Sequence, residues 1–154
     1  MSEHSLVHEI IECDPEFADT QKFCDHYGYS LQESGNVLLV ASKKGAAKFA
    51  ACVVLATCRL DVNKTVRKKL GVSRISFASP EQTKQQTGME LGGVTPFGLP
   101  DHIPVWIDAA VMACERIILG GGNRSSKIIM APAELTKIPH AEVVQDLAFP
   151  IPTE

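Results

Sequence analysis

The sequence predicts a single α+β domain with a mixed, curled, barrel-like β-sheet flanked by helices. Three observations favour this class. The chain has 154 residues, 45% of them hydrophobic, which is the size of one ordinary domain with one core. Short apolar runs typical of strands recur along the chain and dominate over helical signals. Helices fall irregularly between these runs instead of alternating with them, and no linker interrupts residues 1–154, so we expect one domain and not a βαβ array.

In the first half of the chain we expect two helices and a hairpin. An Asp-Pro-Glu start supplies a cap, a proline suited to the first turn and an acid at the positive end of the dipole, and a glycine ends this helix, over 14–28. The apolar runs 37–41 and 49–56 predict two strands joined through 42–45. A second helix, which begins near Leu60 and carries several basic residues, ends at Gly71.

The second half alternates between short strands and short helices. Ser79 and Gln82 fit a capping box at the start of a helix that Gly88 ends. Apolar runs predict the strands 75–78, 105–107, 117–119, 127–130 and 142–144, and a short helix is expected over 132–137.

Composition excludes several classes of protein. The longest apolar runs are far shorter than the roughly 20 residues that cross a bilayer, and the chain starts without a basic and apolar leader. Five cysteines, with no Cys-x-x-Cys pair, predict reduced thiols in a cytoplasmic protein. The five histidines stand apart from one another, so we expect no metal site and no cofactor.

Charge is unevenly distributed along the chain. The net charge is −3, but five basic residues between Lys64 and Arg74 carry +5 with no acid among them, which leaves −8 on the remainder. Such a run is typical of a solvated helix face, and it also suits a local contact with phosphates. The sequence pattern alone leaves both interpretations open.

Two glycine clusters are the most informative motifs. In the first, residues 92–98, two adjacent glycines allow close approach to the main chain and Pro96 makes the loop rigid, which suits either a tight turn or a ligand-binding loop. The second runs from Gly120 to Lys127 after an apolar strand. It lacks the Gly-x-x-x-x-Gly-Lys-Ser/Thr spacing of a nucleotide P-loop, and no hydrolase elbow or Cys–His pair is found.

An ordered set of segments resembles the YbaK-like editing domains, relatives of the insertion domain of bacterial prolyl-tRNA synthetase. The resemblance covers roughly residues 35–146. The matching segments are Leu60-Asp61-x-x-Lys64, Ser79-Pro80-Glu81, Thr87-Gly88-Met89-Glu90, Gly92 to Gly98, Ile107-Asp108-Ala109 and Gly120 to Gly122.

The resemblance implies a free-standing aminoacyl-tRNA deacylase that cleaves the ester between a wrong amino acid and the tRNA 3′ end. Such editing is needed because a binding pocket separates small side chains by only about 1–3 kcal/mol per methylene. The Gly-x-x-x-Pro loop, Gly92 to Pro96 here, would lie against the aminoacyl group and the terminal ribose. Its amides would stabilise the oxyanion while the ribose hydroxyl aligns water. The expected partners are the tRNA acceptor end and an aminoacyl-tRNA synthetase.

Three positions depart from the family pattern. Relatives carry a functional lysine where this chain has Asn36, and Ile11 replaces an aromatic residue. Some relatives have an acid where this chain has Lys127, so we hypothesise that Lys127 supplies the missing charge; an exposed strand residue is the alternative. Asp108 is either a site residue or the cap of a helix that begins at Ala109.

Two other functions stay open, namely a tRNA-binding or regulatory module without hydrolysis and a hydrolase of small aminoacyl esters.

The predicted site has three parts. Catalysis is assigned to Gly92, Gly93, Thr95 and Lys127; substrate binding to Asn36, Val94, Pro96, Phe97, Gly98, Asp108, Gly121 and Gly122; and tRNA phosphate contacts to Arg59, Lys64, Arg67 and Lys68.

Overall fold

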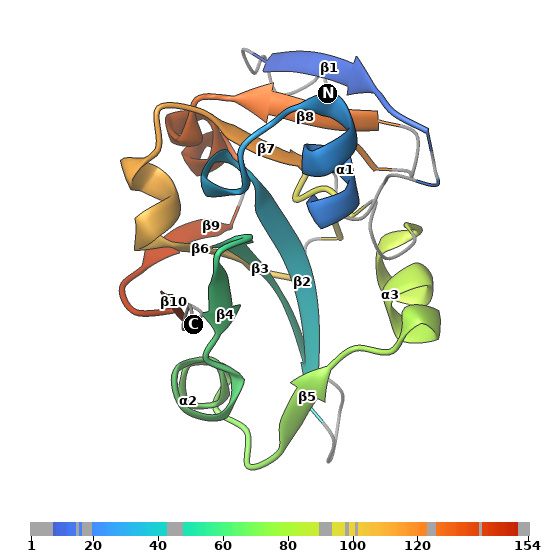
Figure 1. Ribbon diagram of the computed structural model, residues 1–154. Coiled ribbons are helices and arrows are strands. Elements are labelled where there is room, and N and C mark those ends of the chain that lie inside the picture. The colour runs from blue at the N-terminus through green and yellow to red at the C-terminus, as the bar shows by residue number, and fades with distance from the viewer. Residues whose placement is uncertain are drawn as a thin grey trace.

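The structure of the chain is a computed structural model (Figure 1). It describes residues 8–14, 16, 20–42, 48–89, 94–97, 99–100, 102–122, 126–138 and 140–150. Predicted features that involve Gly92, Gly93, Gly98 or the turn 43–47 lie outside the described residues.

A five-stranded mixed sheet forms the middle of the molecule. Its strand order is β5-β2-β3-β6-β9, with antiparallel pairing from β5 to β3 and parallel pairing from β3 to β9. The predicted hairpin is its centre, and its register places Val37 opposite Val53. The strands are β2 (Gly35–Ser42), β3 (Phe49–Leu55), β5 (Ile75–Phe77), β6 (Val105–Asp108) and β9 (Ala141–Val144).

Two smaller antiparallel sheets complete the β-structure. One has the order β1-β8-β7 and touches the five-stranded sheet through a parallel bridge between Ser34 and Ile118. The other pairs β10 with β4. Among the described residues the mixed sheet is therefore not closed into a barrel. The strands are β1 (His8–Glu12), β4 (Cys58–Leu60), β7 (Ile117–Gly120), β8 (Ser126–Met130) and β10 (Ala148–Pro150).

The helices are short, and the glycines predicted to end them are found at their C-terminal ends. The first helix begins at Thr20, later than the start predicted at Asp14. Ser79 and Gln82 form the capping box of α3, and Gly88 ends that helix at φ 74°. Gly28 follows α1 at φ 78°, and Gly71 ends α2 at φ 72°. The helices are α1 (Thr20–Tyr27), α2 (Arg67–Leu70) and α3 (Pro80–Thr87), with the further short helical segments η3 (Leu31–Glu33), η4 (Val62–Val66), η5 (Ala109–Ala113) and η6 (Pro132–Lys137).

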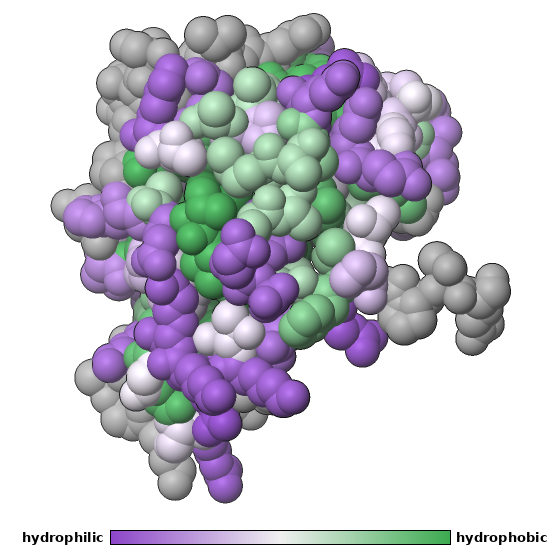
Figure 2. Space-filling view, turned by 90° about the vertical axis from the view of Figure 1, so that its left-hand side faces the viewer, coloured by the Kyte–Doolittle hydropathy of each residue, from purple (hydrophilic) through white to green (hydrophobic). Residues whose placement is uncertain are grey.

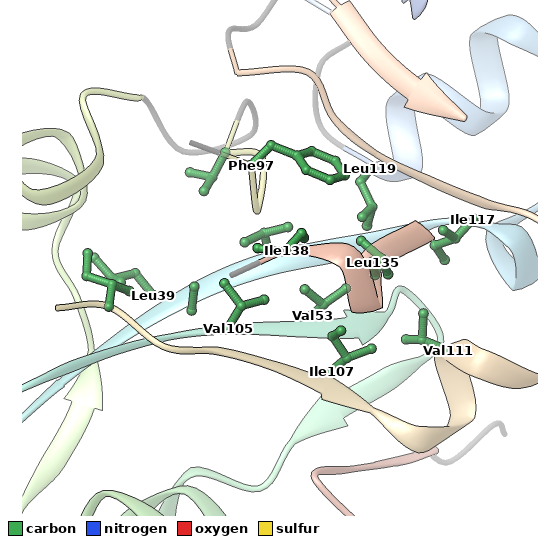
Figure 3. Close-up of a cluster of buried hydrophobic side chains, with 14 of the residues drawn as sticks. Leu39, Val53, Phe97, Val105, Ile107, Val111, Ile117, Leu119, Leu135 and Ile138 are labelled. Carbon is green, nitrogen blue, oxygen red and sulfur yellow. The ribbon is translucent and has the colours of Figure 1, made fainter. Parts of the chain in front are cut away.

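Three apolar clusters hold these layers together. The central cluster lies between the five-stranded and three-stranded sheets (Figure 3) and includes Val37, Val53, Ile107, Leu119 and Ile128. The back cluster lies on the other face of the five-stranded sheet, under η4, α2 and the β4–β10 pair, and includes Val40, Val54, Val66, Trp106 and Leu147. The α1 cluster lies between α1 and the outer face of the three-stranded sheet and includes Phe23, Cys24, Ile118 and Ile129.

None of the five cysteines forms a disulfide bond within the described residues. Cys13, Cys24 and Cys52 are buried, and burial raises the pKa of Cys52 to about 12. Because a thiol with so high a pKa carries almost no thiolate at neutral pH, Cys52 acts as a core residue.

Candidate active site

The first glycine-rich loop is anchored by the core. Its described part runs from Val94 to Phe97, and all four side chains are buried. Val94 and Phe97 belong to the central cluster, and Figure 3 shows the Phe97 ring beside Leu119 of β7. These two apolar side chains fix the loop between the sheets. The polar groups that the described loop offers to a ligand are those of Thr95 and the main chain.

Thr95 has an unusual environment for a polar residue. Its side chain is only 6% exposed, and no hydrogen-bond partner lies within reach of Thr95 Oγ1 among the described residues. The Thr95 amide donates to Met89 Sδ at 3.5 Å, and a thioether sulfur is a weak acceptor. A buried hydroxyl without a partner costs free energy, so such a group is a candidate ligand contact.

The two glycine-rich segments meet at Thr95. A Cβ atom at Gly122 would lie 3.6 Å from Thr95 Cγ2 and 3.7 Å from Met89 Sδ, so Gly122 borders both residues. Its φ of 99° also suits glycine. Gly121 donates its amide to Ser126 O at 3.1 Å and leaves no room for a Cβ, which would lie 2.2 Å from Ser126 Oγ.

Lys127 follows the second cluster on β8, where it pairs with Gly120 of β7. Its side chain is 5% exposed and lies on the outer face of the three-stranded sheet, with Nζ 5.5 Å from the centre of the Phe23 ring. An exposed strand residue, the alternative to a site lysine, is therefore wrong. The main chain of Lys127 is near the glycine cluster, whereas its side chain points towards α1 and away from the central cluster.

Asn36 and Asp108 lie on the opposite face of the five-stranded sheet from the loop. Asn36 alternates with Val37 along β2 and is the cross-strand partner of Val54, which belongs to the back cluster. Asp108 likewise alternates with Ile107. The structure thus brings Asn36 and Asp108 to one face but does not bring either to Thr95.

Asp108 is a buried carboxyl group, 2% exposed, and Oδ2 has no hydrogen-bond partner among the described residues. Desolvation by burial raises its pKa, and the nearby Asp146 adds to the shift. The backbone amides of Ala148, Leu147 and Ala109 oppose the shift. Asp108 occupies the cap position before η5, but its side chain makes no capping hydrogen bond.

The basic helix lies behind the sheet, away from the loop. Val62, Val66 and Leu70 face the back cluster, so Lys64 and Lys68 project outwards from η4 and α2. Arg59 is exposed on β4, and Arg67 is half-buried. Hydrophilic side chains gather over the lower half of Figure 2, the end of the molecule where α2 lies in Figure 1. The predicted phosphate contacts and the loop are therefore on opposite faces of the five-stranded sheet.

Sequence reasoning missed Met89 and Phe23 as neighbours of the site. Met89 belonged to a matching segment, Thr87 to Glu90, but nothing in that segment indicates that a sulfur atom accepts the Thr95 amide. Phe23 lies in the helix predicted over 14–28, and only the packing of α1 on β8 shows its contact with Lys127. The part of the chain that the structure describes contains no cluster of side chains suited to a metal ion. It also has no helix of the length and apolarity needed to span a membrane.

The comparisons with known proteins agree with the family that the motifs indicated. The model of the aminoacyl-tRNA editing domain matches residues 14–138, so the chain belongs to the aminoacyl-tRNA editing domain family. Over 139 residues the chain is 27% identical to the uncharacterized protein YwhH of Bacillus subtilis (strain 168), covering 90% of this chain and 86% of YwhH.

Solved structures confirm the fold. The hypothetical protein APE2540 superimposes with a TM-score of 0.84 at 22% identity, covering 96% of this chain and 95% of that one. A candidate trans-editing enzyme for prolyl tRNA synthetase has a TM-score of 0.75 at 22% identity, covering 90% of this chain and 85% of that one. The predicted α+β editing-domain fold is thereby confirmed.

Proposed function

We propose that the protein is a trans-editing deacylase of the cytoplasm that hydrolyses the ester of a mischarged aminoacyl-tRNA at its 3′ end. The observation that carries this proposal is the buried hydroxyl of Thr95, which has no hydrogen-bond partner among the described residues and lies in a loop fixed by the core. Gly122 of the second glycine cluster borders Thr95, because a Cβ atom there would lie 3.6 Å from Thr95 Cγ2. Membership of the editing family supplies the class of substrate.

The chemistry needs preorganised donors more than a strong base. In this proposal the ester carbonyl accepts hydrogen bonds from loop amides and from Thr95 Oγ1, and the developing oxyanion strengthens them. Gly92 and Gly93 allow the main chain to approach the carbonyl, with Pro96 as the rigid end. Water aligned by a ribose hydroxyl attacks the carbonyl carbon, and the ribose oxygen leaves with a proton.

Lys127 provides the cation in this proposal. The burial of its side chain against Phe23 and the position of its main chain beside the glycine cluster support this assignment. The direction of its side chain towards α1 implies that it binds the part of the substrate nearest α1. Lys127→Ala should lower kcat/KM at least tenfold, and Lys127→Arg should retain part of it. Unchanged deacylation by Lys127→Ala would remove Lys127 from the mechanism.

A hydrolase of small aminoacyl esters is the second candidate, favoured by one observation. Lys64 and Lys68 project from the face opposite the loop, so they are poorly placed to guide the 3′ end itself. In the tRNA proposal, Arg59, Lys64, Arg67 and Lys68 contact phosphates of the tRNA beyond the terminal nucleotides. Lys64→Glu combined with Lys68→Glu should then raise KM for aminoacyl-tRNA and leave turnover of an aminoacyl methyl ester unchanged.

Deacylation of a panel of misacylated tRNAs tests the function. The proposal predicts multiple turnovers on at least one mischarged tRNA, with affinity that falls as salt rises. Turnover of small esters with no salt-sensitive tRNA affinity would identify the second candidate instead. Salt-sensitive tRNA binding without turnover on any member of the panel would overturn hydrolysis and leave a binding module.

A further inference from the structure

We infer that Met89 is a positioning residue, sensitive to oxidation, that holds the Thr95 amide ready for the substrate; the inference rests on the proposed function. Met89 Sδ accepts the Thr95 amide at 3.5 Å and would lie 3.7 Å from a Cβ atom placed at Gly122. The sulfur therefore stands where the loop, the second glycine cluster and the end of α3 converge.

The main chain of Met89 is held firmly, so its sulfur is well positioned. Met89 N donates to Thr87 Oγ1 at 3.0 Å, and Thr87 Oγ1 lies 2.6 Å from Thr83 O, one turn earlier in α3. Gly88 donates to Lys84 O at 2.8 Å and closes the helix. Met89 thus lies just beyond the anchored end of α3, while its side chain packs against the central cluster.

The weakness of sulfur as an acceptor is what suits it to this role. A thioether keeps the Thr95 amide oriented in the free protein, yet the carbonyl oxygen of an ester is a stronger acceptor and displaces it. An oxygen acceptor at the same position would bind the Thr95 amide more strongly, so the ester carbonyl would not displace it. Oxidation of Met89 would create such a strong acceptor, because methionine sulfoxide carries an oxygen on the same sulfur.

Oxidation by a hydroperoxide converts one acceptor into the other. A lone pair of Met89 Sδ attacks the distal oxygen, the O–O bond breaks, the sulfur loses two electrons, and water or an alcohol leaves after proton transfer. The sulfoxide oxygen then accepts the Thr95 amide. Methionine sulfoxide reductase reverses the change, whereas dithiothreitol restores only oxidised cysteines.

Two substitutions of Met89 separate its role as a hydrogen-bond acceptor from its role in packing. Met89→Leu keeps the volume and removes the acceptor, so the amide is less well oriented and kcat should fall about two- to threefold. Met89→Gln puts an oxygen acceptor near the sulfur position, and kcat should fall at least tenfold with little change in KM. Melting temperatures of both variants report whether they fold. Met112→Leu, which changes a partly buried methionine of η5, is the matched control and should keep the wild-type rate.

The decisive experiment treats the full chain with hydrogen peroxide and then dithiothreitol, and follows kcat and the Thr95 amide resonance in a ¹⁵N-labelled sample. We expect kcat to fall at least tenfold in the wild type and in Met112→Leu, to recover with methionine sulfoxide reductases, and to change little in Met89→Leu. The Thr95 amide proton should shift downfield as peptide mass spectrometry shows oxidation of Met89.

The two readouts keep the inference separate from the proposed function. If no substrate is turned over, the Thr95 resonance still tests the contact with Met89. An unchanged resonance at full oxidation of Met89, or equal inactivation of Met89→Leu and the wild type, would overturn the inference and leave the deacylase proposal intact.

Discussion

The Thr65 hydroxyl donates a hydrogen bond to Asp61 Oδ2 at 2.9 Å, so the Asp61 carboxylate binds a side chain of η4 as well as main-chain amides. Asp61 also accepts the amides of Lys64 at 3.3 Å and Thr65 at 3.4 Å. This cap sets the start of the basic segment η4–α2 on the back face of the sheet. The match between Asp61 and the family motif therefore has a structural cause.

Loss of this cap should destabilise the protein. Asp61→Ala leaves two backbone amides without their side-chain acceptor and should lower the free energy of unfolding by about 1 kcal/mol. Asp61→Asn keeps an oxygen acceptor and should lower it by less. Urea unfolding at fixed pH measures both changes. Equal stability of Asp61→Ala and the wild type would mean that packing of Val66 alone holds the segment.

Gly121 and Gly122 should differ sharply in how well they tolerate substitution by alanine. A Cβ at Gly121 would lie 2.9 Å from the carbonyl carbon of Ser126, and main chain cannot move away cheaply, so Gly121→Ala should cost about 3 kcal/mol. Gly122→Ala meets only ordinary contacts, but its positive φ should cost about 1–2 kcal/mol. Thermal unfolding of the two variants gives the order, and the reverse order would contradict this account.

Asp108 should make stability depend on pH. Because the folded protein raises the pKa of this carboxyl group, it binds the proton more tightly than the unfolded chain does. The contribution of Asp108 to stability is thus complete below the unfolded pKa and is lost as pH rises through the folded pKa. Asp108→Asn removes this titration.

Unfolding of the wild type and Asp108→Asn across the acid range, up to neutral pH, measures the effect. The difference in unfolding free energy between variant and wild type should move in favour of the variant as pH rises. A difference that is constant with pH would show that Asp108 does not titrate between the folded and unfolded states in this range.

Local signals predicted much of the fold from the sequence. The capping box of Ser79, the terminal glycines and the central hairpin depend on neighbouring residues, and each is found as expected. The strands β1, β4 and β10 were missed because their pairing is distant in sequence. β4 pairs with β10, for example, through Arg59 opposite Phe149, and three residues carry too little periodicity to predict a strand.

The site was predicted less completely, because strand parity decides which face a residue occupies. Neighbours such as Asn36 and Val37 face opposite sides, so an alignment of motifs cannot say which cluster a side chain enters. The same holds for Lys127 and Ile128. Thr95 and Gly122 were both assigned to the predicted site, and the structure shows that they are neighbours, whereas the sulfur contact of Met89 needed the fold.

Thr95 provides a test in which stability and activity move in opposite directions. Thr95→Val replaces a hydroxyl that has no partner within the described part of the chain with a methyl group of similar shape, so the free energy of unfolding should stay equal or rise by about 1 kcal/mol. If Oγ1 binds the reacting ester, kcat/KM should fall about tenfold or more, since the lost hydrogen bond is strongest in the transition state. Thr95→Ser keeps the hydroxyl and should recover most of the rate. The measurements are deacylation of the best substrate in the panel and urea unfolding of the same preparations. A Thr95→Val variant that loses stability, and a Thr95→Ser variant that regains it, would instead make the hydroxyl a structural group with a partner in the folded protein.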